Sequence, residues 1–84
     1  MNSMMDWDNI RYFLHTVRAG SYTAAGERLN VNRTTIGRRL TQLEESLGVA
    51  LYEQTDEGYR PTSAGHLILE SGRAIERITD DLMG

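Results

Sequence analysis

Two short helical segments joined by only three residues constrain the fold of this chain most strongly. Ser21 can accept hydrogen bonds from the free N–H groups of a helix that extends to Leu29, and Asn32 can cap the next helix. Between the two helices, Asn30-Val31-Asn32 is a tight turn. The second helix is predicted to end at Gly48 and to bury one apolar stripe, made of Ile36, Leu40, Leu43 and Leu47.

A helix is predicted before this pair, and a hairpin and a longer helix after it. Asp6 can cap the first helix and Gly20 can end it, with one apolar face formed by Ile10, Phe13, Leu14 and Val17. Residues 51–55 and 59–62 flank the turn cluster Asp56-Glu57-Gly58 and predict a small hairpin. Thr62 or Ser63 then opens a last helix with heptad spacing, on Ala64, Ile68, Ser71, Ile75, Ile78 and Leu82.

The size and composition of the chain fit one small cytoplasmic domain. A chain of 84 residues buries only about 60–65% of its unfolded surface, so dimerisation would reinforce a marginal core. The absence of cysteine excludes disulfides, thiolate metal sites and a cysteine nucleophile. No apolar run approaches the roughly 18 residues of a membrane span, and the first residues lack a signal region, so we expect no membrane association.

The net charge of −3 argues at first sight against a nucleic-acid partner, but the charge is segregated along the chain. Residues 28–43 hold four arginines and no acidic residue, a net +4, whereas the remainder carries −7. The four arginines are Arg28, Arg33, Arg38 and Arg39. Most charge runs are solvated helix faces, so the position of these arginines on the fold must decide between the two interpretations.

The outer face of the helix that follows Asn32 is basic and carries small residues. When the apolar stripe is buried, a rotation of about 100° per residue places Thr34, Arg38 and Thr41 opposite it, with Arg33 and Gly37 at the flank. Such a helix pair is a helix-turn-helix, whose second helix enters the major groove of DNA. Arg33 and Arg38 are the natural readers, because a guanidinium matches guanine O6 and N7.

The same helix pair also occurs in modules that bind proteins rather than DNA. A winged-helix protein-interaction or dimerisation module without specific DNA binding is therefore the alternative function. Four arginines together in a segment without acidic residues, followed by a hairpin with its own Arg60, favour DNA binding. The free N–H groups at the two helix starts, near Ser21 and Asn32, point towards where phosphates would lie.

The last helix is predicted to form a dimer contact. About 20 residues of helix span about 30 Å, so part of the apolar stripe would extend beyond a domain of this size. A two-fold dimer would present two recognition helices to two half-sites of a pseudo-palindrome. The residues assigned to this contact are Leu67, Ile68, Ile75, Ile78 and Leu82.

No arrangement of residues typical of catalysis, metal binding or cofactor binding is found. His15 and His66 have no acidic or cysteine partner at ligand spacing, and the serines lack a nucleophile motif. We therefore expect that the protein is not an enzyme.

The sequence resembles the N-terminal DNA-binding domain of LysR-type bacterial transcriptional regulators from about Met5 to Met83. The matching motifs are Asp6 with Ile10-Arg11-Tyr12-Phe13, Gly20-Ser21-Tyr22-Thr23-Ala24-Ala25, Leu29-Asn30-Val31, Arg38, Gln42-Leu43-Glu44, Leu47-Gly48-Val49, Leu51-Tyr52-Glu53 and Thr62-x-Ala64-Gly65. The resemblance implies a mainly α fold: a winged helix-turn-helix with a three-helix core and a hairpin wing (residues 1–62), then a linker and dimerisation helix (residues 63–84). It implies sequence-specific binding of double-stranded DNA by a homodimer.

The resemblance also implies which residues touch DNA. Its base-facing positions correspond to Arg33, Thr34, Gly37 and Arg38, although this chain has Asn32-Arg33-Thr34-Thr35-Ile36-Gly37-Arg38 where the family commonly has Ser-Gln-Pro-Ala-Leu-Ser-Arg. In the wing, Gln54 stands where the family often has Arg, and Arg60 would compensate from the neighbouring strand. The full set of expected backbone and wing contacts is Ser21, Thr23, Asn32, Thr35, Thr41, Gln54, Arg60 and Thr62.

Members of this family normally continue into a larger ligand-sensing domain. The chain would then be a fragment that ends at a structural boundary, or else a short stand-alone regulator. A small-molecule effector is expected only if such a C-terminal domain exists.

Overall fold

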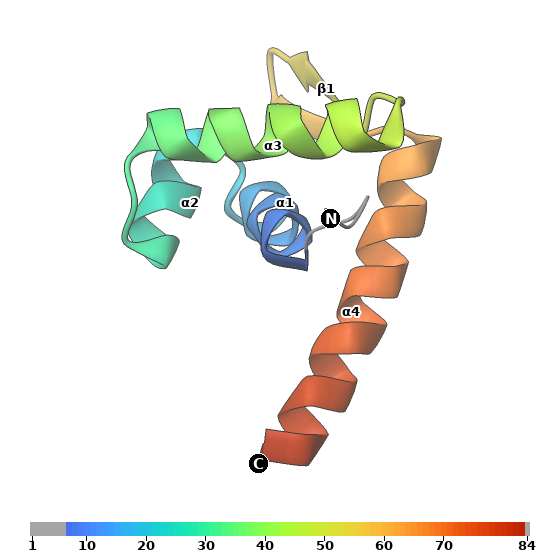
Figure 1. The fold of residues 1–84 in the computed structure, drawn as a ribbon. Helices are drawn as coiled ribbons and strands as arrows, with labels where there is room; N and C mark the ends of the chain where they lie inside the picture. The colour runs from blue at the N-terminus through green and yellow to red at the C-terminus, as the bar shows by residue number, and fades with distance from the viewer. Residues whose placement is uncertain (1–6, 84) are drawn as a thin grey trace.

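The structure is a computed structural model that describes residues 7–83. Asp6, the predicted cap of the first helix, lies outside the described residues. The elements in chain order are α1 (Trp7–Ala19), α2 (Tyr22–Leu29), α3 (Arg33–Leu47), β1 (Tyr52–Thr55), β2 (Gly58–Pro61) and α4 (Ser63–Met83). In Figure 1, α3 lies across one end of the molecule, α1 and α2 lie beneath it, and α4 runs away from it. The predicted mainly α architecture with a hairpin wing and a long last helix is confirmed.

Side chains cap the helix pair as the sequence predicts. Ser21 Oγ accepts a hydrogen bond from the Ala24 N–H at 3.0 Å, and Asn32 Oδ1 accepts one from the Thr35 N–H at 2.8 Å. The two helices end at residues in the left-handed region, Asn30 (φ 61°) and Gly48 (φ 72°). Local sequence therefore determines where α2 and α3 begin and end.

The turn between α2 and α3 depends on a residue that the sequence patterns do not single out. The Val31 N–H donates to the Gly26 carbonyl at 2.9 Å, so the chain folds back tightly on the end of α2. A Cβ on Gly26 would lie only 2.5 Å from the Val31 carbonyl oxygen. Any larger residue at position 26 would push α3 away from α2.

The predicted apolar stripes of α1 and α3 meet in one core. Phe13 and Leu14 of α1 and Ile36 of α3 are at most 1% exposed. Val17 and Leu47, which the stripes also include, are partly buried at the edge of the core. The buried apolar residues are Ile10, Tyr12, Phe13, Leu14, Ala25, Ile36, Leu40, Leu43, Leu51 and Leu69.

The last helix packs through a face that differs from the predicted heptad. Its buried residues are Gly65, Leu69 and Gly72. A Cβ on Gly65 would lie 2.0 Å from the Leu51 carbonyl oxygen, and one on Gly72 would lie 3.0 Å from the Leu14 side chain. The heptad pattern did not predict this face because two of its three residues are glycines, which carry no apolar side chain. These glycines bring α4 close to Leu51 and Leu14.

Ile68, one of the five residues predicted for the dimer contact, is partly buried and packs against the core of its own chain, so its part in a dimer contact stays a prediction. The other four predicted residues remain exposed and are described below. The boundary predicted at residue 62 coincides with the start of α4, but Leu69 of α4 belongs to the same core as the first three helices.

The hairpin turns through two residues rather than the predicted three. Gly58, with φ 120°, is the first residue of β2 and pairs with Thr55, so the turn consists of Asp56 and Glu57. After β2, Thr62 Oγ1 accepts from the Gly65 N–H at 3.1 Å and donates to the Ala50 carbonyl at 2.7 Å. Thr62 is therefore the cap of α4 and ties its start to the segment before β1.

Candidate nucleic-acid interface

The outer face of α3 carries the predicted base-reading residues. Arg33, Thr34, Arg38 and Thr41 are exposed, on the side of α3 away from its buried stripe. Neither Arg33 nor Arg38 forms an ion pair with any residue in the range 7–83. Their guanidinium groups are therefore available to a partner. The predicted position of these side chains is confirmed, whereas their contacts with bases stay a prediction.

Arg39 has a structural role instead. Its Nη2 donates to Asp8 Oδ2 at 2.9 Å, and its Nε donates to Asn9 Oδ1. The guanidinium carbon lies 4.6 Å above the centre of the Tyr12 ring, a cation–π contact. The net charge of +4 on residues 28–43 therefore overstates the charge that faces outward, because one of the four arginines joins α3 to α1.

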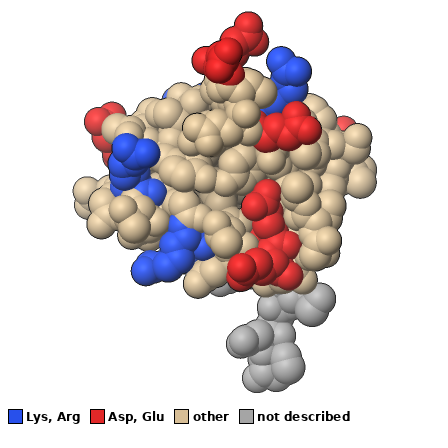
Figure 2. Space-filling model, turned by 90° about the horizontal axis from the view of Figure 1, so that it is seen from above, with Lys and Arg blue, Asp and Glu red and all other residues tan. Residues whose placement is uncertain are grey.

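Figure 2 shows the face of the molecule seen from above α3. Most of the arginine surface lies on the left, over the start of α3, and most of the acidic surface lies on the right and along the upper edge. Arg33 and Arg38 belong to the first half of α3, while Glu44 and Glu45 belong to its last turns. The charge segregation seen along the sequence is thus also a segregation along one helix.

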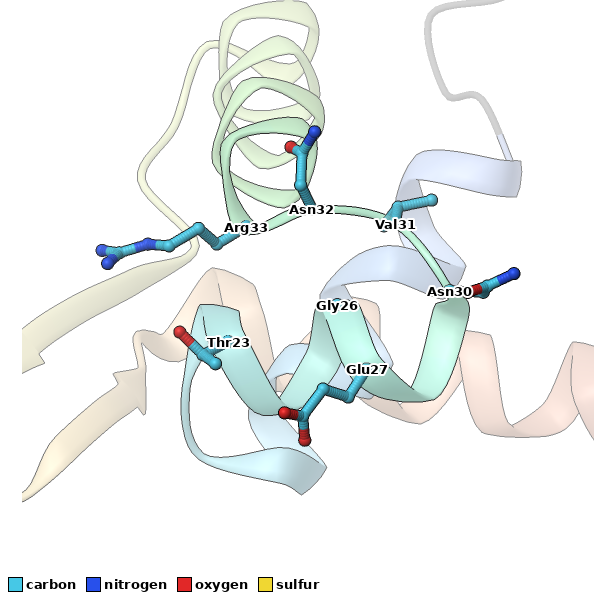
Figure 3. A pocket seen from close by; sticks show the side chains of 7 residues that line it. All are labelled: Thr23, Gly26, Glu27, Asn30, Val31, Asn32 and Arg33. Carbon is cyan, nitrogen blue, oxygen red and sulfur yellow. The ribbon is translucent and has the colours of Figure 1, made fainter.

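A shallow groove runs between α2 and the start of α3 (Figure 3), where the two helix N-termini lie near each other. Thr23 and Glu27 line it from α2, and Asn32 and Arg33 line it from the start of α3. Ser21 and Asn32 use one oxygen each for capping, so the Ser21 hydroxyl hydrogen and the Asn32 amide N–H groups remain able to donate. Glu27 adds an acidic group to this edge of the groove. It lies one residue before the acid-free segment 28–43, so the net charge of that segment does not include it.

The other expected backbone contacts differ in how accessible they are. Thr23 and Thr41 are exposed, whereas Thr35 is half-buried. The hydroxyl of Thr62 is already engaged in the α4 cap as donor and acceptor. A phosphate near Thr62 would therefore have to share that hydroxyl with the cap.

The two wing residues singled out from the sequence lie on opposite faces of the hairpin. Gln54 pairs with Tyr59 and Arg60 pairs with Glu53, and cross-strand partners share a face. Arg60 also lies 3.8 Å from Glu57 in an exposed ion pair. Arg60 therefore cannot simply replace an arginine at position 54, because it points the other way and lies among carboxylates.

An aromatic cluster that the sequence patterns do not reveal joins the wing to the helices. The rings of Tyr22 and Tyr59 are stacked at 5.0 Å and 3°, and Tyr52 meets Tyr59 edge-on at 5.4 Å. Burial raises the pKa values of Tyr52 and Tyr59. The sequence signal was only that all four tyrosines, these three and Tyr12, lie outside the predicted apolar stripes.

The comparisons with known proteins agree with this geometry. Residues 7–66 match the family described as bacterial regulatory helix-turn-helix protein, lysR family. The chain belongs to the LysR family. Its relatives include the HTH-type transcriptional regulator TcbR of Pseudomonas sp. (strain P51), 39% identical over 71 residues, and the Mau operon transcriptional activator of Paracoccus denitrificans, 42% identical over 66 residues.

The chain spans about a quarter of the length of these LysR-family relatives. The matches cover 84% of this chain and 24% of TcbR, and 79% of this chain and 23% of the Mau operon activator. Both relatives are named as transcriptional regulators rather than enzymes.

Solved structures of this family have the same fold. The structure of the CbnR_DBD-DNA complex is 36% identical, with a TM-score of 0.82, and the match covers 92% of this chain and 88% of that one. The structure of the BenM_DBD/catB site 1 DNA complex is 26% identical, with a TM-score of 0.86, and the match covers 94% and 85%. The predicted winged helix-turn-helix is confirmed.

Within residues 7–83, no helix is long and apolar enough to cross a bilayer. The same residues include no group of three or more acidic or histidine side chains that could hold a metal ion. His15 and His66, the two histidines considered as ligands, lie on different helices, α1 and α4.

Proposed function

We propose that this chain binds double-stranded DNA sequence-specifically, as the DNA-binding module of a LysR-type transcriptional regulator in the bacterial cytoplasm. The observation that carries the proposal is the outer face of α3, where Arg33 and Arg38 are exposed and without an ion-pair partner among residues 7–83. Two similar solved structures, those with CbnR_DBD and BenM_DBD, are complexes with DNA. The chain acts by binding, not by catalysis.

In this proposal, the first half of α3 enters the major groove. Arg33, Thr34, Gly37 and Arg38 lie at base edges, while phosphate contacts come from the starts of α2 and α3 and from the wing. Residues 1–62 form the DNA-contacting unit and residues 63–84 the linker and dimerisation helix. The complete set of proposed backbone and wing contacts is Ser21, Thr23, Asn32, Thr35, Thr41, Gln54, Arg60 and Thr62.

The decisive experiment selects tight binders from random duplexes and then measures affinity against salt. We expect selected duplexes to contain two half-sites related by a two-fold axis and to bind more tightly than random DNA. The logarithm of affinity should fall linearly with the logarithm of salt concentration, because bound arginines release counterions from phosphates. If selected and random duplexes bound equally weakly, a protein-interaction module would be the better description of this winged helix.

The exposed face of α4 supports the homodimer. Leu67, Ile75, Ile78 and Leu82 are 66%, 42%, 59% and 82% exposed. In Figure 1 the C-terminal half of α4 extends away from the other helices. A second copy of α4 packed on these four residues would bury apolar surface that now faces solvent.

The dimer is tested by Ile75→Glu, with the oligomeric state measured by sedimentation at micromolar concentration. We expect the variant to be a folded monomer, because Ile75 lies outside the core. His66→Glu adds the same carboxylate to another exposed position of α4 and should remain dimeric. A dimeric Ile75→Glu protein would contradict this contact.

A further inference from the structure

The side chain of Tyr22 lies where three elements meet. It extends from the first turn of α2, stacks on Tyr59 of β2, and exchanges a hydrogen bond with the hydroxyl of Tyr52 of β1. Its ring carbon Cε2 lies 3.1 Å from the point that a Cβ on Gly37 of α3 would occupy. One side chain thus touches both strands of the wing and the first half of α3, which carries Arg33 and Arg38.

The ring of Tyr22 is held from several sides. Tyr59, its stacking partner, meets Tyr52 edge-on, and Tyr52 lies 6.2 Å from the fully buried Phe13. Burial and the hydrogen bond with Tyr22 raise the pKa of Tyr52, so the Tyr52 hydroxyl stays protonated at neutral pH. The wing is therefore connected to the core through a short chain of aromatic contacts.

Gly37 provides the space that this arrangement needs. Glycine destabilises a helix interior relative to alanine, so a glycine in the first half of α3 requires a compensating contact. The Tyr22 ring occupies the position next to the missing Cβ, at a distance tighter than most real Cβ contacts. A side chain at position 37 would have to displace either the ring or the helix.

We propose that Tyr22 is a positioning residue that holds the wing at a set distance from α3, and that Gly37 is the small residue that admits its ring. This inference rests on the proposed DNA binding. The major-groove helix and the wing then reach the same duplex together, because one side chain sets their separation. Tyr22 itself need not touch the DNA.

The test measures whether the wing still reaches the duplex when Tyr22 loses its hydroxyl. The reporter is Gln54→Arg, which places a charge on an exposed position of the hairpin face that also carries Tyr59. In the parent protein, this substitution should steepen the slope of log affinity against log salt by about 0.9, the value for one added phosphate contact. In a Tyr22→Phe background, the same substitution should leave the slope unchanged.

A stability change alone would not produce this result, because the slope reports contacts made by the folded protein. Tyr12→Phe, which removes a hydroxyl from a buried tyrosine beneath Arg39, is the matched control and should keep the full gain from Gln54→Arg. Tyr52→Phe removes the same hydroxyl contact from the wing side and serves if Tyr22→Phe does not fold. Gly37→Ala tests the contact from the side of α3. Helix propensity alone predicts a higher Tm for this variant. Displacement of the Tyr22 ring predicts instead a lower Tm and no steepening of the salt slope by Gln54→Arg.

Two outcomes would contradict the positioning role of Tyr22 and still be compatible with the proposed DNA binding. The Gln54→Arg gain could be equal in the parent and the Tyr22→Phe backgrounds, or absent from both while the selected duplex still binds with a steep salt slope. Failure of the proposed function looks different, because the parent protein would then bind selected and random duplexes alike.

Discussion

Arg38 and Arg39 are adjacent in the sequence, but they belong to two regions with different physical tasks. On the outer face of α3, Arg38 is exposed and without an ion-pair partner in the range 7–83. On the inner side, where α3 and α4 meet α1, Arg39 binds Asp8 and Asn9, and Arg18 binds Glu76 at 2.8 Å. A charge count along the chain therefore adds together two kinds of arginine: one stabilises the fold and the other is left for a partner.

The largest effect is expected from Gly65→Ala, at the start of α4, where the helix packs against Leu51. The new Cβ would lie 2.0 Å from the Leu51 carbonyl oxygen, a backbone atom that cannot move aside cheaply. We expect the free energy of unfolding to fall by about 3 kcal/mol, measured by denaturant titration at one fixed protomer concentration. Ser71→Ala, on an exposed position of the same helix, should stay within about 0.5 kcal/mol of the parent. Equal stability of the two variants would contradict the close packing of α4 against the rest of the domain.

On the outer face, Arg38→Ala should change DNA binding and leave stability alone. Loss of a bidentate contact with guanine costs about 1–3 kcal/mol, so affinity for a selected duplex should fall by about fivefold to about 150-fold. The free energy of unfolding should stay within about 0.5 kcal/mol, because the side chain lies outside the core. Unchanged affinity would show that Arg38, like most surface arginines, is only solvated and does not contact DNA.

The converse holds for Arg39→Ala. The variant loses a partly exposed ion pair, a hydrogen bond and a cation–π contact, so the free energy of unfolding should fall by about 1–2 kcal/mol. DNA affinity, measured below the unfolding transition, should stay within about twofold, because distant charges are screened at 0.15 M salt. A large loss of affinity with unchanged stability would instead place Arg39 on the DNA-binding face.

The smallest effect concerns pH at the junction of α1 and α4. Burial, together with Arg18 and Arg11, lowers the pKa of His15, and no partner for its Nδ1 lies within residues 7–83. Glu76 opposes this shift, but its own pKa is lowered mainly by the hydrogen bond from Arg18, so that it stays ionised. A histidine whose pKa is lowered on folding contributes stability above its ordinary pKa of 6.5 and loses it as pH falls below that value.

The pH effect is measured as Tm between pH 7 and about pH 5, a window that lies mostly above the titration of Glu76. His15→Gln should flatten the decline of Tm in this window. His66→Gln, on an exposed position of α4, is the matched substitution and should decline as the parent does. If the Tm of the parent protein stayed constant as the pH was lowered from 6.5 to about 5, protonation of His15 would not destabilise the fold.

The helix pair shows how far local sequence reaches. Ser21 and Asn32 cap α2 and α3 as predicted, because a cap depends on atoms two or three residues away. The apolar stripe of α3 is buried for a similar reason, since its period is a property of the helix itself. The winged fold and the exposed position of Arg33, Thr34 and Arg38 follow from these local rules.

Contacts between distant segments were decided by tertiary structure alone. Glycine has no side chain to appear in an apolar pattern, so the approach of Gly65 to Leu51, of Gly72 to Leu14 and of Gly37 to Tyr22 could not be read from the sequence. The partial burial of Ile68 has the same origin, because the rotation of α4 depends on which face can come closest to α1.

The helices, the hairpin and the position of the basic segment follow from local sequence, because helix periodicity and capping act within one or two turns. Tertiary contacts set the engagement of Arg39 with α1, the face of α4 that is buried, and the way the wing is held. Those outcomes depend on packing among residues far apart in the chain, such as Arg39 with Asp8 and Tyr22 with Tyr52. Packing depends on how side chains fit together in three dimensions, and the periodic pattern of the amino-acid sequence does not contain that information.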